Sequence, residues 1–194
     1  MMYKLLYILS SVLFVFCACN NNRVENEIRN LFGRQITFPT GYVSLSYHDS
    51  LSVDLLLTKD IKMVSYIDDL PCTSCGVRML RSWAEEVKEI DPEVAYVIVV
   101  QTQEKDVLFE NFDSMRLSCP LMYYDTPVFG EVNKLDVLAR NKTFLLNREN
   151  RIVLVGEPFN NEKLFHLYRK TIASLKEEYT HERKKQAKKA NENL

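Results

Sequence analysis

The sequence is short of several features that define common classes of protein. It has only five glycines in 194 residues, and they are not clustered. A nucleotide-binding loop needs a glycine-rich stretch to cradle phosphate, so the sequence offers no such loop. Basic and acidic side chains are nearly balanced, at 25 against 26. Without a basic excess there is no electrostatic sign of a nucleic-acid partner.

Metal-ligand patterns are also scarce. The three histidines, His48, His166 and His181, show no ligand-like spacing, and the chain has a single Cys-x-x-Cys pair. A structural zinc site needs four ligands, which typically come as two paired sets. The sequence therefore indicates no cofactor, and metal binding stays only as one alternative interpretation of the cysteine pair.

The apolar run at the start of the chain is too short for a comfortable membrane span. It extends from Leu5 to Phe16, whereas a spanning helix needs about 20 apolar residues. Its length fits the hydrophobic region of a secretory signal. Ala18 and Cys19 follow, with three asparagines after them. This ending resembles a bacterial lipoprotein signal, in which the cysteine becomes the lipidated first residue of the mature protein.

That resemblance implies a signal peptide over residues 1–18, lipidation of Cys19 and a polar tether over residues 19–33. The protein would be lipid-anchored in the cell envelope, periplasmic or outward-facing; the alternative is an uncleaved N-terminal anchor. An exported chain lies where disulfides form and persist. With Cys19 taken by lipid, the other mature cysteines are Cys72, Cys75 and Cys119. We expect one pair and one odd cysteine, with Cys119 a buried small apolar residue.

Hydrophobic periodicity predicts an alternation of strands and helices along the middle of the chain. The predicted strands cover residues 61–67, 94–100, 120–124, 143–146 and 151–155, and the predicted helices cover 76–90, 107–117, 129–139 and 161–175. This order predicts an α/β fold in which a parallel unit is followed by an antiparallel hairpin.

The flanking segments complete the predicted organisation. Alternating stretches over residues 34–58, including SVDLLL, predict a hairpin or added edge strands, which would form an N-terminal β extension. The main domain is predicted over residues 59–176. The charged residues 177–194 are expected to continue the last helix into solvent as a tail.

The cysteine pair occupies a position with consequences for its chemistry. Cys72 and Cys75 lie between the predicted strand 61–67 and the predicted helix 76–90. Free N–H groups give a helix N-terminus a partial positive charge, which would stabilise a thiolate on Cys72. Cys75, one turn further on, is close enough to attack a mixed disulfide formed at Cys72. Arg78 and Arg81 would add positive potential, which the aspartates just before the pair oppose.

A Cys-x-x-Cys directly after such a strand resembles the thioredoxin-like superfamily. The resemblance is carried by IKMVSYIDDLPCTSCGVRMLRSW, VAYVIVV and KTFLLNRENRIVLVGEP, and it covers roughly residues 55–176. It is closer to the extracytoplasmic lipoprotein and cytochrome-maturation-type branch. It implies a thioredoxin-like mixed sheet flanked by helices, an attacking Cys72 and a resolving Cys75, with Thr73 and Ser74 tuning the reduction potential. It also implies a protein thiol or disulfide substrate and a membrane electron donor.

The sequence departs from the family pattern at three places. Pro71 replaces the usual aromatic residue before the first cysteine, and the following helix lacks a proline. Lys142, just before Thr143, occupies the slot of a cis-proline that keeps the backbone open to substrate. Two hypotheses follow. The first is a lipid-anchored thiol–disulfide oxidoreductase acting as a reductase, and the second is a non-catalytic binding or assembly lipoprotein with a structural disulfide.

Overall fold

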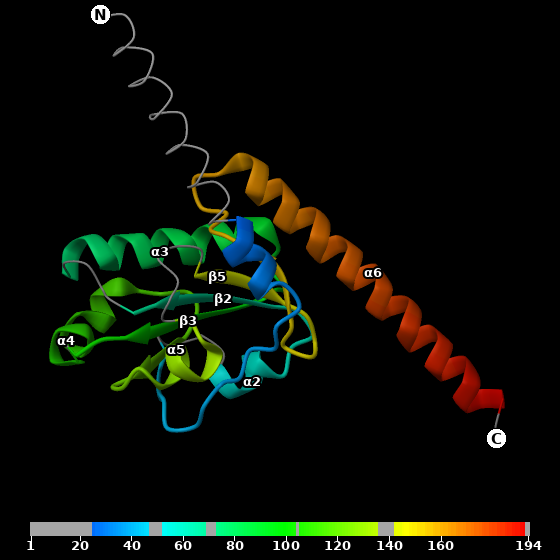
Figure 1. The fold of residues 1–194 in the computed structure, drawn as a ribbon, viewed down its shortest axis with the longest axis horizontal. Helices are drawn as coiled ribbons and strands as arrows, with labels where there is room; N and C mark the ends of the chain where they lie inside the picture. Colours follow the sequence, from blue (N-terminus) through cyan, green and yellow to red (C-terminus); the bar gives the residue numbers. More distant parts are fainter. Residues whose placement is uncertain (1–24, 47–51, 69–72, 104, 136–141, 193–194) are drawn as a thin grey trace, which may run out of the picture.

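The computed structural model describes residues 25–46, 52–68, 73–103, 105–135 and 142–192. Within these ranges, six strands form one mixed sheet with helices on both faces (Figure 1). The strand order is β1-β4-β3-β2-β5-β6. The strands are β1 Val43–Leu45, β2 Lys62–Ile67, β3 Ala95–Gln101, β4 Leu121–Tyr124, β5 Thr143–Leu146 and β6 Ile152–Val155.

The pairing confirms the predicted combination of a parallel unit and a late hairpin. Strand β3 runs parallel to both β2 and β4, while β5 is antiparallel to β2 and β6 is antiparallel to β5. The turn between β5 and β6 is closed by Asn147, whose side-chain oxygen accepts from the N–H groups of Glu149 and Arg151 at 3.1 and 2.8 Å. Asn150 takes the left-handed backbone conformation that this turn needs.

Within the described ranges, the helices that cover the sheet are α2 Val53–Leu57, α3 Thr73–Ile90, α4 Lys105–Met115, α5 Val128–Asn133 and α6 Glu162–Glu192. Helices α3, α4 and α6 pack into one hydrophobic cluster, and α2 and α5 pack into another on the opposite face. Figure 1 shows the sheet edge-on between α3 on one side and α5 with α2 on the other. No helix in the described ranges has both the length and the apolar content that crossing a membrane would require.

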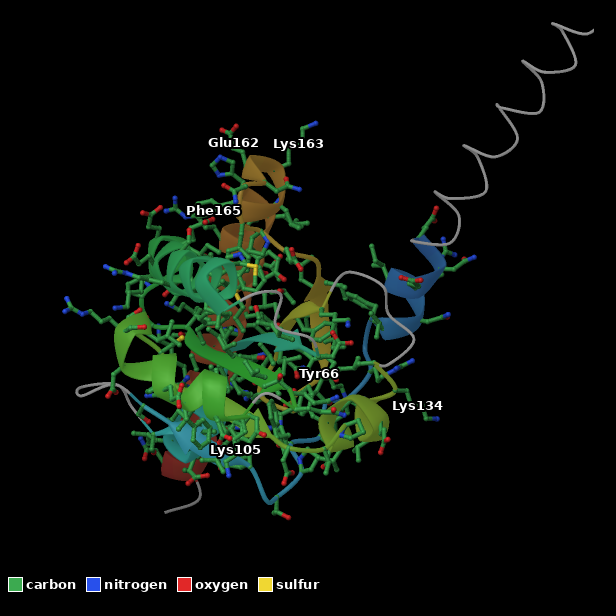
Figure 2. All side chains as sticks on the ribbon, turned by 90° about the vertical axis from the view of Figure 1, so that its left-hand side faces the viewer. Tyr66, Lys105, Lys134, Glu162, Lys163 and Phe165 are labelled. Atoms are coloured by element: carbon green, nitrogen blue, oxygen red, sulfur yellow. The ribbon has the colours of Figure 1, made fainter. Side chains whose placement is uncertain are left out.

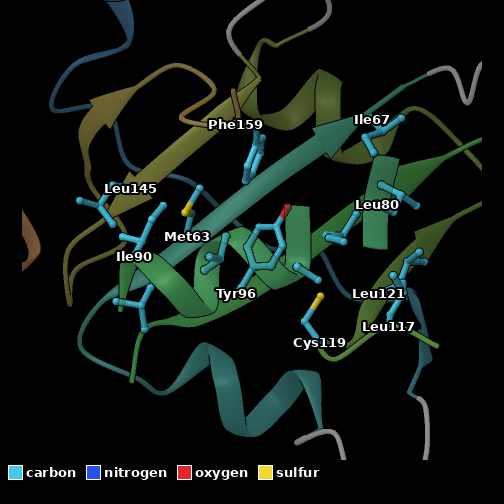
Figure 3. Packing of buried hydrophobic residues seen from close by; sticks show 14 of the residues in the cluster. Met63, Ile67, Leu80, Ile90, Tyr96, Leu117, Cys119, Leu121, Leu145 and Phe159 are labelled. Carbon is cyan, nitrogen blue, oxygen red and sulfur yellow. The ribbon is translucent and has the colours of Figure 1, made fainter. Parts of the chain in front are cut away.

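Helix α3 forms because its apolar residues recur at helical spacing. Leu80, Ala84, Val87 and Ile90 are all buried against the sheet, as the sequence predicted. The helix ends before the Asp91-Pro92 dipeptide, since proline disfavours helical backbone in the residue that precedes it. Figure 3 shows the resulting core, in which α3 side chains meet those of β2, β3 and β4.

Of the two predictions for residues 34–58, a hairpin or added edge strands, the described residues show one added edge strand. One three-residue strand, β1, pairs antiparallel with β4 at the sheet edge and supplies the predicted β extension. The SVDLLL segment forms helix α2 instead of a strand. Val53 and Leu56, three residues apart, are its buried residues, and the Ser52 hydroxyl accepts from the Leu55 N–H at the N-cap. A capping serine and a three-residue apolar spacing specify a helical turn.

The predicted polar tether is also corrected. Residues 25–31 are helical, and Leu31 is buried in the core on the α5 face. The chain that follows is attached to α5 through Asn133. Its amide donates to the Thr37 carbonyl at 2.8 Å and its side-chain oxygen accepts from the Thr37 N–H at 2.8 Å. An apolar anchor and a paired amide therefore fix this segment to the domain. Cys19 and the predicted signal peptide lie outside the described residues.

Helix α5 is shorter than the predicted helix over residues 129–139. It ends at Asn133, and Lys134 takes a left-handed conformation at the C-cap, from which its N–H bonds back to the helix. A left-handed residue stops helical propagation. Residues 136–141 lie outside the described part of the chain.

Helix α6 packs against the domain beyond the predicted boundary at residue 176. Tyr179 is buried, and the Arg148 guanidinium lies 3.7 Å from its ring centroid. Lys176 pairs with Asp91 at 2.7 Å, and Arg183 pairs with Asp60 at 2.6 Å. Residues 184–191 are all exposed, although they remain helical. The tail therefore leaves the domain near residue 184 instead of residue 177.

We predict that two truncations in α6 will differ sharply in stability. A chain that ends after Lys184 keeps every contact just described, so its free energy of unfolding should change by no more than about 0.5 kcal/mol. A chain that ends after Lys176 loses the buried ring of Tyr179, which should cost about 3 kcal/mol. Urea unfolding of both chains beside the full chain measures this. Equal stabilities for the two truncated chains would show that α6 contributes nothing beyond residue 176.

Candidate functional site

The structure places the segment that carries the cysteine pair at the carboxyl end of β2. Strand β2 ends at Ile67 and α3 begins at Thr73. The backbone of Thr73, Ser74 and Cys75 belongs to the first turn of α3, while their side chains lie outside the described part. Pro71 and Cys72 lie outside the described residues altogether. Helix α3 begins three residues before the predicted start at residue 76, so the backbone of Cys75 is inside it. The roles of Cys72 and Cys75 stay a prediction.

The start of α3 has an electrostatic character that suits a thiolate. The first N–H groups of a helix are without intrahelical acceptors and carry partial positive charge. No acidic residue occurs in the first turn of α3 to offset this charge. Arg81, which the sequence offered as a further source of positive potential, pairs with Glu85 at 3.1 Å in an exposed position. The N-terminus of α3 is therefore a more direct source of positive potential for a thiolate than Arg81 is.

Lys142 lies beside the end of β2. Its carbonyl accepts from the Tyr66 N–H at 2.9 Å, which extends the β2–β5 ladder by one residue. Its side chain is only 15% exposed and forms an ion pair with Asp68. The Lys142 nitrogen also lies 5.5 Å from the centroid of the Tyr66 ring. The amine of Lys142 thus lies against Tyr66 of β2 and against Asp68, the residue that follows β2.

Thr143 lies inside the protein instead of facing a groove. Its side chain is buried, and its hydroxyl is 3.0 Å from that of Ser65. The Tyr96 hydroxyl donates to Ser65 at 2.9 Å, and either hydroxyl of the Ser65–Thr143 pair can be the donor. Burial raises the pKa of Tyr96 well above its usual value, so this ring stays neutral. The predicted neighbour Thr143 therefore belongs to a neutral chain of hydroxyls on the α3 face of the sheet.

Tyr66 is a neighbour that the sequence reasoning did not identify. Its ring is buried against Phe129, and its hydroxyl donates to the Gln101 side chain at 2.9 Å. The hydroxyl lies so near Gly130 that a β-carbon there would collide with it. Figure 2 shows Tyr66 near the middle of the face formed by the carboxyl ends of the strands. The strand pattern of β2 predicted burial for Tyr66 but gave no signal of these polar contacts.

Cys119 lies at the opposite end of the sheet from the pair. It precedes β4, whereas the pair follows the carboxyl end of the parallel strand β2. Its side chain packs in the core beside Tyr96 (Figure 3). Burial raises the pKa of the Cys119 thiol to about 12, against a smaller opposite effect of Lys88. The prediction that Cys119 is a buried apolar residue is confirmed, and its thiol stays protonated at neutral pH.

Two further observations bear on the site. Trp83 of α3 stacks on Phe159 at 4.6 Å between ring centroids, which makes it part of the packing between α3 and the segment before α6.

A groove of about 480 Å³ lies at the amino ends of β3 and β4, away from the carboxyl end of β2. Its lining includes Cys119, Lys88 and Pro92. Among the side chains that the structure describes, no three of His, Cys, Asp or Glu are grouped as a metal ion would need.

The arrangement defines a class of protein. A mixed sheet with a parallel centre and an antiparallel hairpin, covered by helices on both faces, with a Cys-x-x-Cys in the sequence where β2 leads into α3, is a thioredoxin-like fold. The predicted fold class is therefore confirmed.

Comparison with known proteins agrees on the fold. No protein-family model and no curated protein sequence matches the chain. A candidate protein disulfide isomerase from Bacteroides thetaiotaomicron is 17% identical, with 78% of this chain and 94% of that chain covered and a TM-score of 0.51. The reduced 2-Cys peroxiredoxin of Plasmodium vivax is 7% identical, with 75% and 99% covered and a TM-score of 0.51. At such low identity these likenesses concern the fold.

We predict that Cys119 makes stability depend on pH in the alkaline range. An unfolded cysteine loses its proton near pH 8.5, whereas the folded thiol keeps it up to about pH 12. The unfolded chain therefore binds fewer protons in this window, and stability falls as pH rises. The advantage of the native chain over Cys119→Ala in urea unfolding should shrink by about 1.4 kcal/mol per pH unit above pH 9. A constant difference from pH 8 to 10.5 would contradict the burial of this thiol.

Proposed function

We propose that the protein is a thiol–disulfide oxidoreductase that uses Cys72 and Cys75. The observation that carries the proposal is the thioredoxin-like sheet, in which the chain between β2 and α3 holds the first cysteine of the Cys-x-x-Cys and the first turn of α3 holds the second. A helix N-terminus lowers the pKa of a thiol and so supplies the thiolate that this reaction needs. The fold shared with a candidate disulfide isomerase supports the same proposal.

The proposed reaction is dithiol–disulfide exchange. The Cys72 thiolate attacks one sulfur of a substrate disulfide, the substrate S–S bond breaks, and the second substrate sulfur leaves as a thiolate that takes up a proton. Cys75 then loses its proton and attacks the Cys72 sulfur. This step forms the Cys72–Cys75 disulfide and releases the first substrate sulfur as a thiol. The substrate gains two electrons and two protons, and the protein loses them.

The direction of exchange and the location of the protein belong to the same proposal. The branch that the sequence resembles mostly keeps exported thiols reduced, so we propose a reductase that acts on protein disulfides. A membrane electron donor would restore the dithiol after each cycle. Lipidation at Cys19 would keep the domain in the cell envelope, beside that donor. The signal-like segment ending in Ala18-Cys19 supports this location.

The alternative is a binding or assembly lipoprotein in which the two cysteines form only a structural disulfide. The observation that favours it is Lys142, which stands where the family has a substrate-facing proline. Pro71, in place of an aromatic residue, points the same way. The reduction potential of the Cys72–Cys75 couple distinguishes the two functions, because a structural disulfide has a potential below about −300 mV.

We predict that the pair is redox-active. The Cys72–Cys75 couple should equilibrate between about −270 and −120 mV in defined thiol buffers, and Cys75→Ser should accumulate a mixed disulfide between Cys72 and a partner protein in cells. Cys119→Ala is the matched control, since that buried thiol should change neither result. A couple below about −300 mV, together with no adduct in Cys75→Ser cells, would support the structural alternative.

We predict a second, independent result for the anchor. Cys19→Ser should remove the lipidation site and shift the protein from the membrane fraction to the soluble envelope fraction. Cys17→Ser is the matched control, because residue 17 lies within the predicted signal and should leave the fractionation unchanged. Equal membrane association of both variants would indicate an uncleaved N-terminal anchor.

A further inference from the structure

We infer that the C-terminal part of α6 is a docking surface for anionic membrane lipid. The surface consists of four lysines near the end of the helix, which we call the lysine stripe: Lys184, Lys185, Lys188 and Lys189. The inference goes beyond the proposed function, because it concerns which surface of the protein rests on a membrane and does not involve the dithiol.

Helix α6 carries the lysine stripe past the rest of the domain. Figure 1 shows α6 along one side of the fold, with its C-terminal end, in red, extending beyond the sheet and the other helices. Residues 184–191 are all exposed and remain helical. At a rise of about 1.5 Å per residue, the stripe is about 8 Å long. A partner can therefore contact the whole stripe without moving any part of the domain.

The stripe lies on the sides of α6 that face away from the domain. Ile172 and Tyr179, seven residues apart, are buried against the domain. Steps of four and seven residues from Tyr179 lead to Arg183 and Gln186 instead of to a lysine. The four lysines form two pairs spaced four apart, which follow other lines along the helix. A flat surface that approaches α6 from outside therefore meets the lysines first.

The charged residues just before the stripe are already paired with the domain. The Glu182 carboxylate accepts from Arg148 at 2.8 Å, and Arg183 pairs with Asp60 at 2.6 Å. These two ion pairs hold α6 against the domain, and they direct the Glu182 carboxylate toward Arg148. Residues 184–191 contain no acidic residue. The stripe therefore concentrates positive charge at this end of the helix.

The stability of the helix does not account for the stripe. Like charges four residues apart on a helix repel each other. Cations within the last turn are favourable because they complement the helix dipole. Lys184 and Lys185, however, lie about two turns before the end of α6 at Glu192. A negatively charged partner would remove the repulsion between the lysines, so the stripe suits a complex better than it suits a helix in water.

The composition of the stripe favours lipid headgroups as the partner. Lysine meets a phosphate as a point charge, whereas arginine is the residue of planar, bidentate recognition. Residues 184–191 include no aromatic ring on which a base of nucleic acid could stack. Their apolar residues are Ala187 and Ala190, which are too small to insert into a bilayer. A row of point charges without specific geometry matches a flat array of anionic headgroups. The predicted export signal supports a membrane nearby.

We predict that the full chain prefers anionic vesicles. It should bind vesicles of phosphatidylcholine with about a third phosphatidylglycerol more tightly than vesicles of phosphatidylcholine alone. The apolar segment at the start of the chain meets both kinds of vesicle, so the ratio of the two partition coefficients isolates the effect of charge. Lys184→Gln with Lys185→Gln should lower this ratio about twentyfold, because each lysine near an anionic surface contributes about fivefold. Vesicle sedimentation measures both coefficients.

Salt and two further variants serve as controls. Raising the salt to about 1 M shortens the Debye length to about 3 Å, so the ratio should fall close to one. Lys105→Gln with Lys134→Gln removes the same net charge from exposed lysines outside α6, both labelled in Figure 2, and should change the ratio less than about twofold. The chain that ends after Lys184 lacks the other three lysines of the stripe and should lose most of the preference. Its unchanged urea unfolding would separate this loss from unfolding.

The outcomes decide the inference without reference to the cysteines. An unchanged ratio in Lys184→Gln with Lys185→Gln overturns it, and so does an equal loss in the Lys105 and Lys134 control. Persistence of the preference in the chain that ends after Lys184 also overturns it. Binding of duplex DNA that depends on the stripe, without a preference for anionic vesicles, would assign the stripe to a different class of partner. None of these results bears on exchange at Cys72 and Cys75, which the reduction potential tests separately.

Discussion

The antiparallel pairing of β5 with β2 is the constraint on which the site depends. It sets the register in which Ser65 faces Thr143, and it therefore decides which residue of the later hairpin reaches the exit of β2. A shift of one residue would exchange the two faces of β5 and turn Thr143 away from Ser65. The buried hydroxyl chain on one face and the Asp68–Lys142 pair on the other are both consequences of this single register.

The region where β2 ends and β5 begins has a neutral side and a charged side. On the α3 face, Ser65, Thr143 and Tyr96 satisfy one another with hydroxyl hydrogen bonds and carry no charge at neutral pH. Charges lie at the end of the sheet, in the partial positive charge of the α3 N-terminus and in the Asp68–Lys142 ion pair.

Much of the fold followed from local sequence patterns, and much of the site did not. Continuous β-branched runs marked β2 and β3 because both faces of these strands are buried, and helical spacing marked α3. The sequence did not predict helix α2, because five residues with two buried positions show little hydrophobic periodicity. The contacts of α6 with Asp60 and Asp91, and the Lys142–Asp68 pair, join residues more than 70 positions apart. Sheet register brings Lys142 to Asp68 and the packing of α6 brings its side chains to Asp60 and Asp91, so local sequence patterns do not predict these contacts.

Asn133 has a mechanical consequence. Its amide group bonds to Thr37 through both its nitrogen and its oxygen, and its nitrogen also donates to the Phe129 carbonyl at 2.9 Å. Tension on the chain before residue 37 is therefore carried into α5, whose Gly130 abuts Tyr66. Tyr66 in turn supports the Lys142 amine. The N-terminal segment and the end of β2 are thus the two ends of one short series of contacts, along which a pull on the N-terminal segment of the domain reaches Tyr66 and Lys142.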